Sequence, residues 1–107
     1  MATLASTTDR INVLVDRIES GDYPDRARVE ETLTEGYAWA LKLDAECGRL
    51  ERCISANAEQ LATGSNEEQA KELSALARLL AHRRQERDTL RARLARLRTR
   101  VREAPVT

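Results

Sequence analysis

The side chains best suited to chemistry are arginines, which crowd into the last third of the chain. Residues 81–107 hold nine basic and three acidic side chains, and the whole chain has sixteen Arg against two Lys. Guanidinium groups bind phosphates and carboxylates through paired hydrogen bonds. Four of them, which we call the arginine set, are candidates for binding nucleic acid or a small anion such as a nucleotide: Arg83, Arg84, Arg87 and Arg91.

Acidic residues earlier in the chain offer a competing interpretation of these arginines. Residues 21–63 hold nine acids and five bases, and the formal net charge of the chain is zero. Glu86 and Asp88 interrupt the basic segment, and aromatic residues make up only 3% of the chain, so no base-stacking pattern accompanies the arginines. Complementary charges on facing helices commonly set pairing in coiled coils. We therefore favour internal neutralisation, and keep anion binding as the alternative.

Enzymatic and metal-binding patterns are absent from the sequence. It contains no glycine-rich phosphate loop, no nucleophile elbow and no H-E-x-x-H motif. Its one histidine, His82, is expected to be a solvated surface residue. Cys47 and Cys53 are six residues apart, which on a helix separates them by about 9 Å, too far for a disulfide. We expect two reduced thiols, no catalytic residue, no metal and no cofactor.

Long helices with heptad patterns must position the arginines. Residues 24–62 contain small or apolar residues at spacings that alternate between four and three, and this pattern lasts for more than four heptads. This seam comprises Val29, Leu33, Gly36, Ala40, Leu43, Cys47, Leu50, Ile54, Asn57 and Leu61. A second helix is predicted over residues 66–103, after a turn at 63–65 in which Gly64 ends the first helix and Ser65 to Glu68 form a capping box.

Two long helices joined by a short turn run antiparallel. Centring the turn near residue 65 pairs positions whose numbers add to about 130, for example Leu50 with Leu80 and Gly36 with Leu94. In the same register, Arg83 and Arg87 occupy seam positions. We expect their guanidinium groups to lean outward to acids of the facing helix, namely Asp44, Glu46 and Glu51, or to acids of a second chain.

A short helix is predicted over residues 8–20, capped by Thr7 or Thr8 and ended by Gly21, with Pro24 at the first position of the next helix. Its apolar stripe is predicted to complete a three-helix core. The residues of that core are Ile11, Leu14, Val15, Ile18, Val29, Leu33, Leu90, Leu94, Leu97 and Val101. Trp39 is expected to pack against the short helix or to stack on Arg93.

The tip of the hairpin, residues 41–90, has no third helix of its own chain to cover it. Four residues there form the candidate partner or dimer interface: Leu41, Cys53, Leu76 and Leu79. We expect two tips to pack into an antiparallel four-helix bundle, or the helix of another protein to take the same place.

The sequence thus predicts one all-α domain spanning residues 1–107, a short helix plus a long antiparallel hairpin. The first eight residues lack the basic and apolar regions of a signal peptide, and no window is apolar enough to cross a membrane, so we expect a cytoplasmic protein. The functional hypothesis is a non-enzymatic, coiled-coil assembly or regulatory module that acts as a homodimer or through a helical partner.

Overall fold

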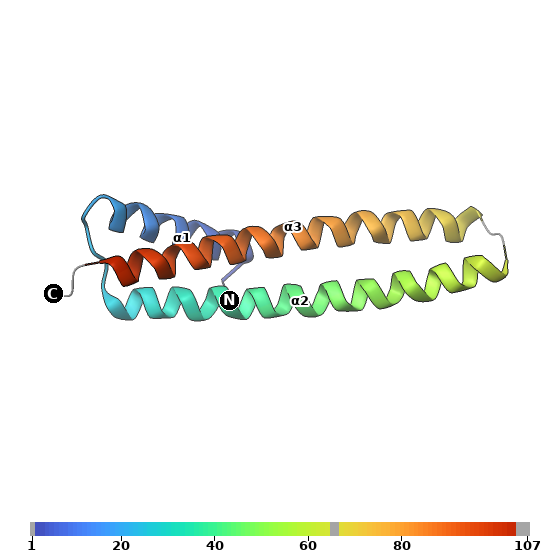
Figure 1. The fold of residues 1–107 in the computed structure, drawn as a ribbon, viewed down its shortest axis with the longest axis horizontal. Coiled ribbons are helices and arrows are strands. Elements are labelled where there is room, and N and C mark those ends of the chain that lie inside the picture. The colour runs from blue at the N-terminus through green and yellow to red at the C-terminus, as the bar shows by residue number, and fades with distance from the viewer. Residues whose placement is uncertain (1, 65–66, 105–107) are drawn as a thin grey trace. The chain divides into compact units, whose positions relative to one another are not determined.

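The computed structural model describes residues 2–64 and 67–104, and these residues form three helices and no strand. The helices are α1 (Leu4–Glu19), α2 (Arg26–Thr63) and α3 (Glu67–Glu103), and together they contain 90% of the described residues. Figure 1 shows α2 and α3 running in opposite directions. The prediction of an all-α fold with a helical hairpin is confirmed.

The helix α1 begins earlier than residue 8, the position that the sequence predicts. Thr3 is its N-cap, and the Oγ1 atom of Thr3 accepts a hydrogen bond from the main-chain N–H of Ser6 at 3.1 Å. Thr8 instead donates its hydroxyl to the carbonyl of Leu4, and Thr7 is fully buried. The prediction of a cap at Thr7 or Thr8 is therefore wrong, because Thr3 satisfies an N–H group one turn earlier.

The end of α1 follows the prediction closely. Gly21 has a φ of 84°, a left-handed conformation that glycine adopts without strain. The N–H of Gly21 donates to the carbonyl of Ile18, and the N–H of Asp22 donates to that of Arg17. These two bonds are those of a Schellman motif, and they turn the chain toward α2.

The helix α2 begins two residues after the predicted start at Pro24. Asp25 lies just outside it and accepts a hydrogen bond from the N–H of Ala27 through its carboxylate. An aspartate at this position satisfies a free N–H group, so Asp25 rather than Pro24 sets the start of α2. At the other end α2 stops at Thr63, directly before Gly64, while Ser65 and Asn66 of the predicted capping box lie outside the described residues.

The chain divides into two compact units, and α2 and α3 contribute to both. We call Met1–Leu41 with Asp88–Thr107 the three-helix unit, and Lys42–Arg87 the hairpin unit. That the two units fold as one domain over residues 1–107 stays a prediction.

The core of the three-helix unit joins the apolar faces of α1, α2 and α3. Its buried apolar residues are Ile11, Leu14, Val15, Ile18, Val29, Ala40, Leu90, Leu94 and Leu97. Gly36 is also buried, and the space where a Cβ atom would stand is already taken by the side chain of Leu94. The predicted meeting of Gly36 with Leu94 is therefore confirmed, whereas Val101 is 37% exposed and lies outside the core.

The hairpin unit has a smaller core, built from two helices alone. Cys47, Leu50 and Leu80 are buried together, and Ile54 and Leu76 pack against them partly exposed. These residues are the ones that the predicted register brings together. The heptad pattern thus identified both the buried face of α2 and the segment of α3 that it meets.

Candidate functional site

Two apolar residues lie together on one flank of the hairpin unit. Cys53 lies seven residues after Glu46 on α2, and Leu79 lies seven residues before Glu86 on α3. Arg83 donates to both of these carboxylates, so Glu46 and Glu86 share a flank. Because seven residues are two helical turns, Cys53 and Leu79 lie on that same flank, further toward the turn.

The flank defined by Cys53 and Leu79 is open to solvent. Leu79 is 38% exposed, and Cys53 is an exposed free thiol. Of the other predicted interface residues, Leu76 packs partly against its own chain. Leu41 is 70% exposed but belongs to the three-helix unit, so the structure does not bring it together with Cys53 and Leu79.

Three members of the arginine set, Arg83, Arg84 and Arg87, are bound by acids of their own chain. Arg83 Nε lies 2.8 Å from Glu46 Oε1, and Arg83 Nη1 lies 2.6 Å from Glu86 Oε1. These hydrogen bonds, first to Glu86 and then to Glu46, raise the pKa of Arg83 above its ordinary value. The guanidinium is thus held between two carboxylates on one flank of the hairpin.

Two further arginines of the hairpin unit bind acids of α2. Arg84 Nη2 lies 2.9 Å from Glu51 Oε1, and Arg87 Nη1 lies 3.3 Å from Asp44 Oδ1. Glu46 and Asp44 receive the two seam guanidiniums, those of Arg83 and Arg87, as expected, whereas Glu51 pairs with Arg84 and not with a seam arginine. Arg91 is exposed, belongs to the three-helix unit and also takes part in an interaction.

These ion pairs contribute more to register than to stability. Their side chains remain partly exposed, and each such pair is worth roughly 0.2–1 kcal/mol. Any other register of the hairpin would separate several of these charges at once. A phosphate group that bound Arg83, Arg84 or Arg87 would have to displace a carboxylate.

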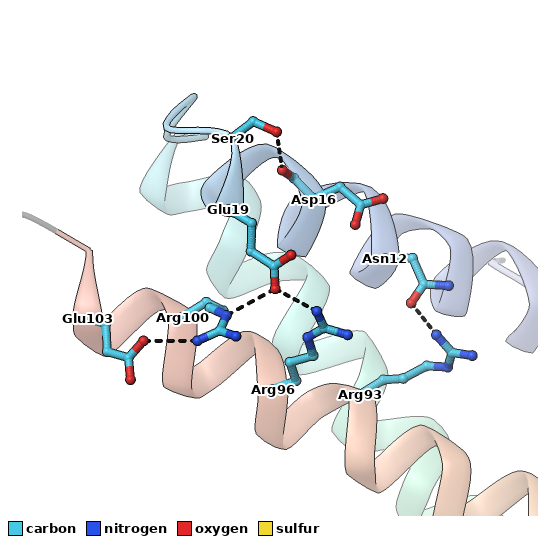
Figure 2. Close-up of polar contacts among 8 residues, drawn as sticks. All are labelled: Asn12, Asp16, Glu19, Ser20, Arg93, Arg96, Arg100 and Glu103. Carbon is cyan, nitrogen blue, oxygen red and sulfur yellow. Dashed lines mark hydrogen bonds and ion pairs between the residues drawn. The ribbon is translucent and has the colours of Figure 1, made fainter.

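A second polar cluster, in the three-helix unit, joins the end of α1 to α3 (Figure 2). Glu19 Oε1 accepts hydrogen bonds from Arg96 Nη2 at 2.6 Å and from Arg100 Nε at 3.0 Å. Arg96 first and Arg100 second lower the pKa of Glu19. Hydrogen bonds to Glu19 and then to Glu103 raise the pKa of Arg100.

This cluster was not predicted from the sequence, because heptad spacing identifies buried faces and not the polar rim of a short helix. Beside it, Arg93 Nη1 donates to Asn12 Oδ1 at 2.5 Å. Trp39 takes part in an interaction of its own, and its packing against α1 or stacking on Arg93 stays a prediction. In the same unit, the guanidinium carbon of Arg98 lies 6.0 Å from the centre of the Tyr37 ring, at the outer limit of a cation–π contact.

Two hollows open on the three-helix unit. One, of about 260 Å³, lies between α1 and α3 and is lined by Asn12, Val15, Asp16, Arg93 and Arg96. The other, of about 690 Å³, is more apolar, and its lining includes Ile18, Tyr23, Pro24, Val29, Leu33 and Val101. The second hollow explains why Val101 is exposed although its spacing continues the apolar pattern of α3.

Metal-binding and membrane-spanning features are both missing from residues 2–64 and 67–104. No group of three or more His, Cys, Asp or Glu side chains in these ranges is placed to hold a metal ion. His82 is exposed, as expected, with Nε2 3.5 Å from Glu86 Oε1. None of the helices in the described part of the chain has a stretch apolar enough to cross a membrane.

No protein-family model, no curated protein and no solved structure matches this chain.

Proposed function

We propose that the hairpin unit is a non-enzymatic assembly or regulatory module that pairs with the hairpin of a second copy of the chain. The observation that carries this proposal is the exposure of Cys53 and Leu79 on one flank, beside a core of few residues. Two packed helices bury little apolar surface, and adding two more gives the common four-helix arrangement. Covering this flank would enlarge the small core of the hairpin.

A second copy is the simplest occupant of the Cys53 and Leu79 flank. A two-fold interface uses the same patch on both chains, so each hairpin would supply apolar residues to cover those of the other. Because the two chains are identical, each helix of one hairpin also has a helix of the same length to pair with in the other hairpin. A helical segment of a different protein could cover the same residues. The two partners are distinguished by the alkylation of Cys53, because only pairing with a second copy makes its rate depend on the concentration of this protein.

Anion or nucleic-acid binding by the arginine set receives less support. Three of its four guanidiniums are hydrogen-bonded to carboxylates of α2 within the hairpin unit. A polyanion would have to release these acids, which offsets much of the gain from each new contact. Reduced thiols are stable in the cytoplasm, and with free Cys47 and Cys53 we propose that compartment.

The exposed thiol of Cys53 provides a direct test of self-association. We expect the rate at which a maleimide alkylates Cys53 in the reduced protein to fall as the protein concentration rises, because association covers the flank. Leu79→Glu should remove this concentration dependence, since it places a charge where the second chain packs. Ala81→Glu, which adds the same charge at an exposed position two residues away, should retain it.

The rate should be followed by mass spectrometry of the peptide that contains Cys53, with the buried Cys47 as an internal reference. A rate that is the same at every concentration and in all three proteins would contradict pairing of identical chains. In that case a different helical protein becomes the candidate partner for the flank.

A further inference from the structure

The hollow between α1 and α3 has an unusual distribution of charge for its size. Two guanidiniums, those of Arg93 and Arg96, stand on the α3 side, and the carboxylate of Asp16 stands on the α1 side. Figure 2 shows the Asp16 side chain on α1 above the side chains of Arg93 and Arg96 on α3. This hollow lies in the three-helix unit, so a ligand bound there is independent of the proposed pairing of the hairpin.

The polar groups around the hollow are not fully paired with one another. Arg96 binds Glu19 through Nη2, and Arg93 binds Asn12 through Nη1. Arg93 Nε is buried and has no acceptor among the described residues. The Asp16 carboxylate receives no hydrogen bond from them either, although the main-chain carbonyl of Asp16 accepts from Ser20. The hollow therefore offers donors on one side and an acceptor on the other.

The positive and negative side chains around the hollow are equal in number, which favours a ligand with no net charge. The cluster in Figure 2 contains three carboxylates, from Asp16, Glu19 and Glu103, and three guanidiniums, from Arg93, Arg96 and Arg100. A simple anion at the arginines would be repelled by Asp16, and a simple cation at Asp16 would be repelled by the arginines. A ligand that carries both charges and no net charge satisfies both sides.

We propose that this hollow binds a small aliphatic amino acid as its zwitterion. The carboxylate of the ligand would bind Arg93 and Arg96, whose planar groups suit it, and its ammonium would bind Asp16. The hollow measures about 260 Å³, which leaves ample room for a small amino acid, and among its lining residues Val15 alone is apolar. Because so little apolar surface is available there, a long apolar side chain gains little, and a short side chain or none suits the hollow best. Glycine and alanine are the members of this class that fit best.

The proposal is tested by titrating isotope-labelled protein with glycine and recording the amide signals by NMR. We expect saturable shifts at Asn12, Asp16, Arg93 and Arg96, which separates site binding from the general effect of an osmolyte. Acetate and methylammonium, which carry one half of the zwitterion each, should bind at least tenfold more weakly.

Two variants and two matched controls complete the test. Asp16→Asn and Arg96→Gln should each weaken glycine binding at least tenfold, while their spectra remain those of folded protein. Asp9→Asn on α1 and Arg102→Gln on α3 change exposed residues of the same types and should bind as the unmodified chain does. Shifts that do not saturate, or acetate that binds as well as glycine, would overturn the proposal. Unchanged binding by Asp16→Asn would do the same.

Discussion

Gly36 is a buried residue of α2 that packs directly against the side chain of Leu94 on α3. A Cβ atom there would collide with the side chain of Leu94, which is itself buried and has little room to move. We expect Gly36→Ala to lower the free energy of unfolding by about 1–2 kcal/mol, because overpacking outweighs the better helix propensity of alanine.

Gly48 provides the matched control for this substitution. It lies on the same helix, and a Cβ atom there would meet only Arg52, at an ordinary contact distance of 3.5 Å. Gly48→Ala should raise the free energy of unfolding by about 0.5–1 kcal/mol. Both values follow from urea unfolding monitored by circular dichroism. Equal effects of the two substitutions would contradict the close packing of Gly36 against Leu94.

Arg83 and Arg87 occupy positions where the heptad pattern favours apolar residues. Leucine at these positions adds apolar burial to the seam, and the acids left without a partner, Glu46 and Asp44, are partly exposed and can be solvated, which avoids the cost of a fully buried charge. We expect the double variant Arg83→Leu with Arg87→Leu to be at least as stable as the unmodified chain in urea. It should also form assemblies of mixed size, because the charges that set the register are gone.

Arg84→Leu is the control for the seam variant, since Arg84 also pairs with an acid of α2 but is more exposed. Its free energy of unfolding should change by no more than about 0.5 kcal/mol. The double variant could instead lower the free energy of unfolding by more than about 1 kcal/mol, as expected when an important ion pair is broken. That result would show that these ion pairs stabilise the fold and do not merely set the register of the helices.

At the scale of elements, Glu19 fastens the end of α1 to α3 through Arg96 and Arg100. Its pKa is lowered in the folded chain, from an ordinary value of 4.5. A carboxylate with a lowered folded pKa stabilises the protein at pH values above the unfolded pKa. That stabilisation disappears as the pH falls through the folded pKa.

We therefore expect the melting temperature of the unmodified chain to exceed that of Glu19→Gln near neutral pH, and the difference to vanish in acid. Thermal unfolding of both proteins, from about pH 7 down to about pH 3, measures this difference. Asp9→Asn, at an exposed position of α1, should show no such trend. A gap between the unmodified chain and Glu19→Gln that persists at low pH would show that Glu19 acts through packing and not through its charge.

The long helices were predictable because local and long-range signals agree. The heptad of α2, together with the short turn, was enough to match Gly36 with Leu94 and to place Arg83 and Arg87 near acids. One offset between two antiparallel helices determines the register, so a single matched pair of residues predicts the other pairs along both helices.

The ends of elements and the polar contacts of α1 were less predictable. Thr3 and Asp25 each cap a helix, but several neighbouring residues could have done so. Glu19, Asn12 and the hollow beside them depend on how α1 is rotated and tilted against α3. The spacing of apolar residues fixes that rotation only roughly, so it does not identify polar partners on the rim.

At the scale of the whole molecule, the two units differ in the size of their cores and in the surfaces that they expose. The three-helix unit has a core from three helices and carries the hollows, whereas the hairpin unit has a small core and an exposed apolar flank. Pairing of two hairpins would explain why Cys53 and Leu79 are exposed in the single chain, since a second chain would cover them.

The most direct test of this pairing is the solution mass of the reduced protein, measured by light scattering over a series of concentrations. We expect a mass of about twice 12.1 kDa at high concentration, with Ala81→Glu unchanged and Leu79→Glu at the mass of one chain. A mass of one chain for the unmodified protein at every concentration would contradict pairing through the hairpin.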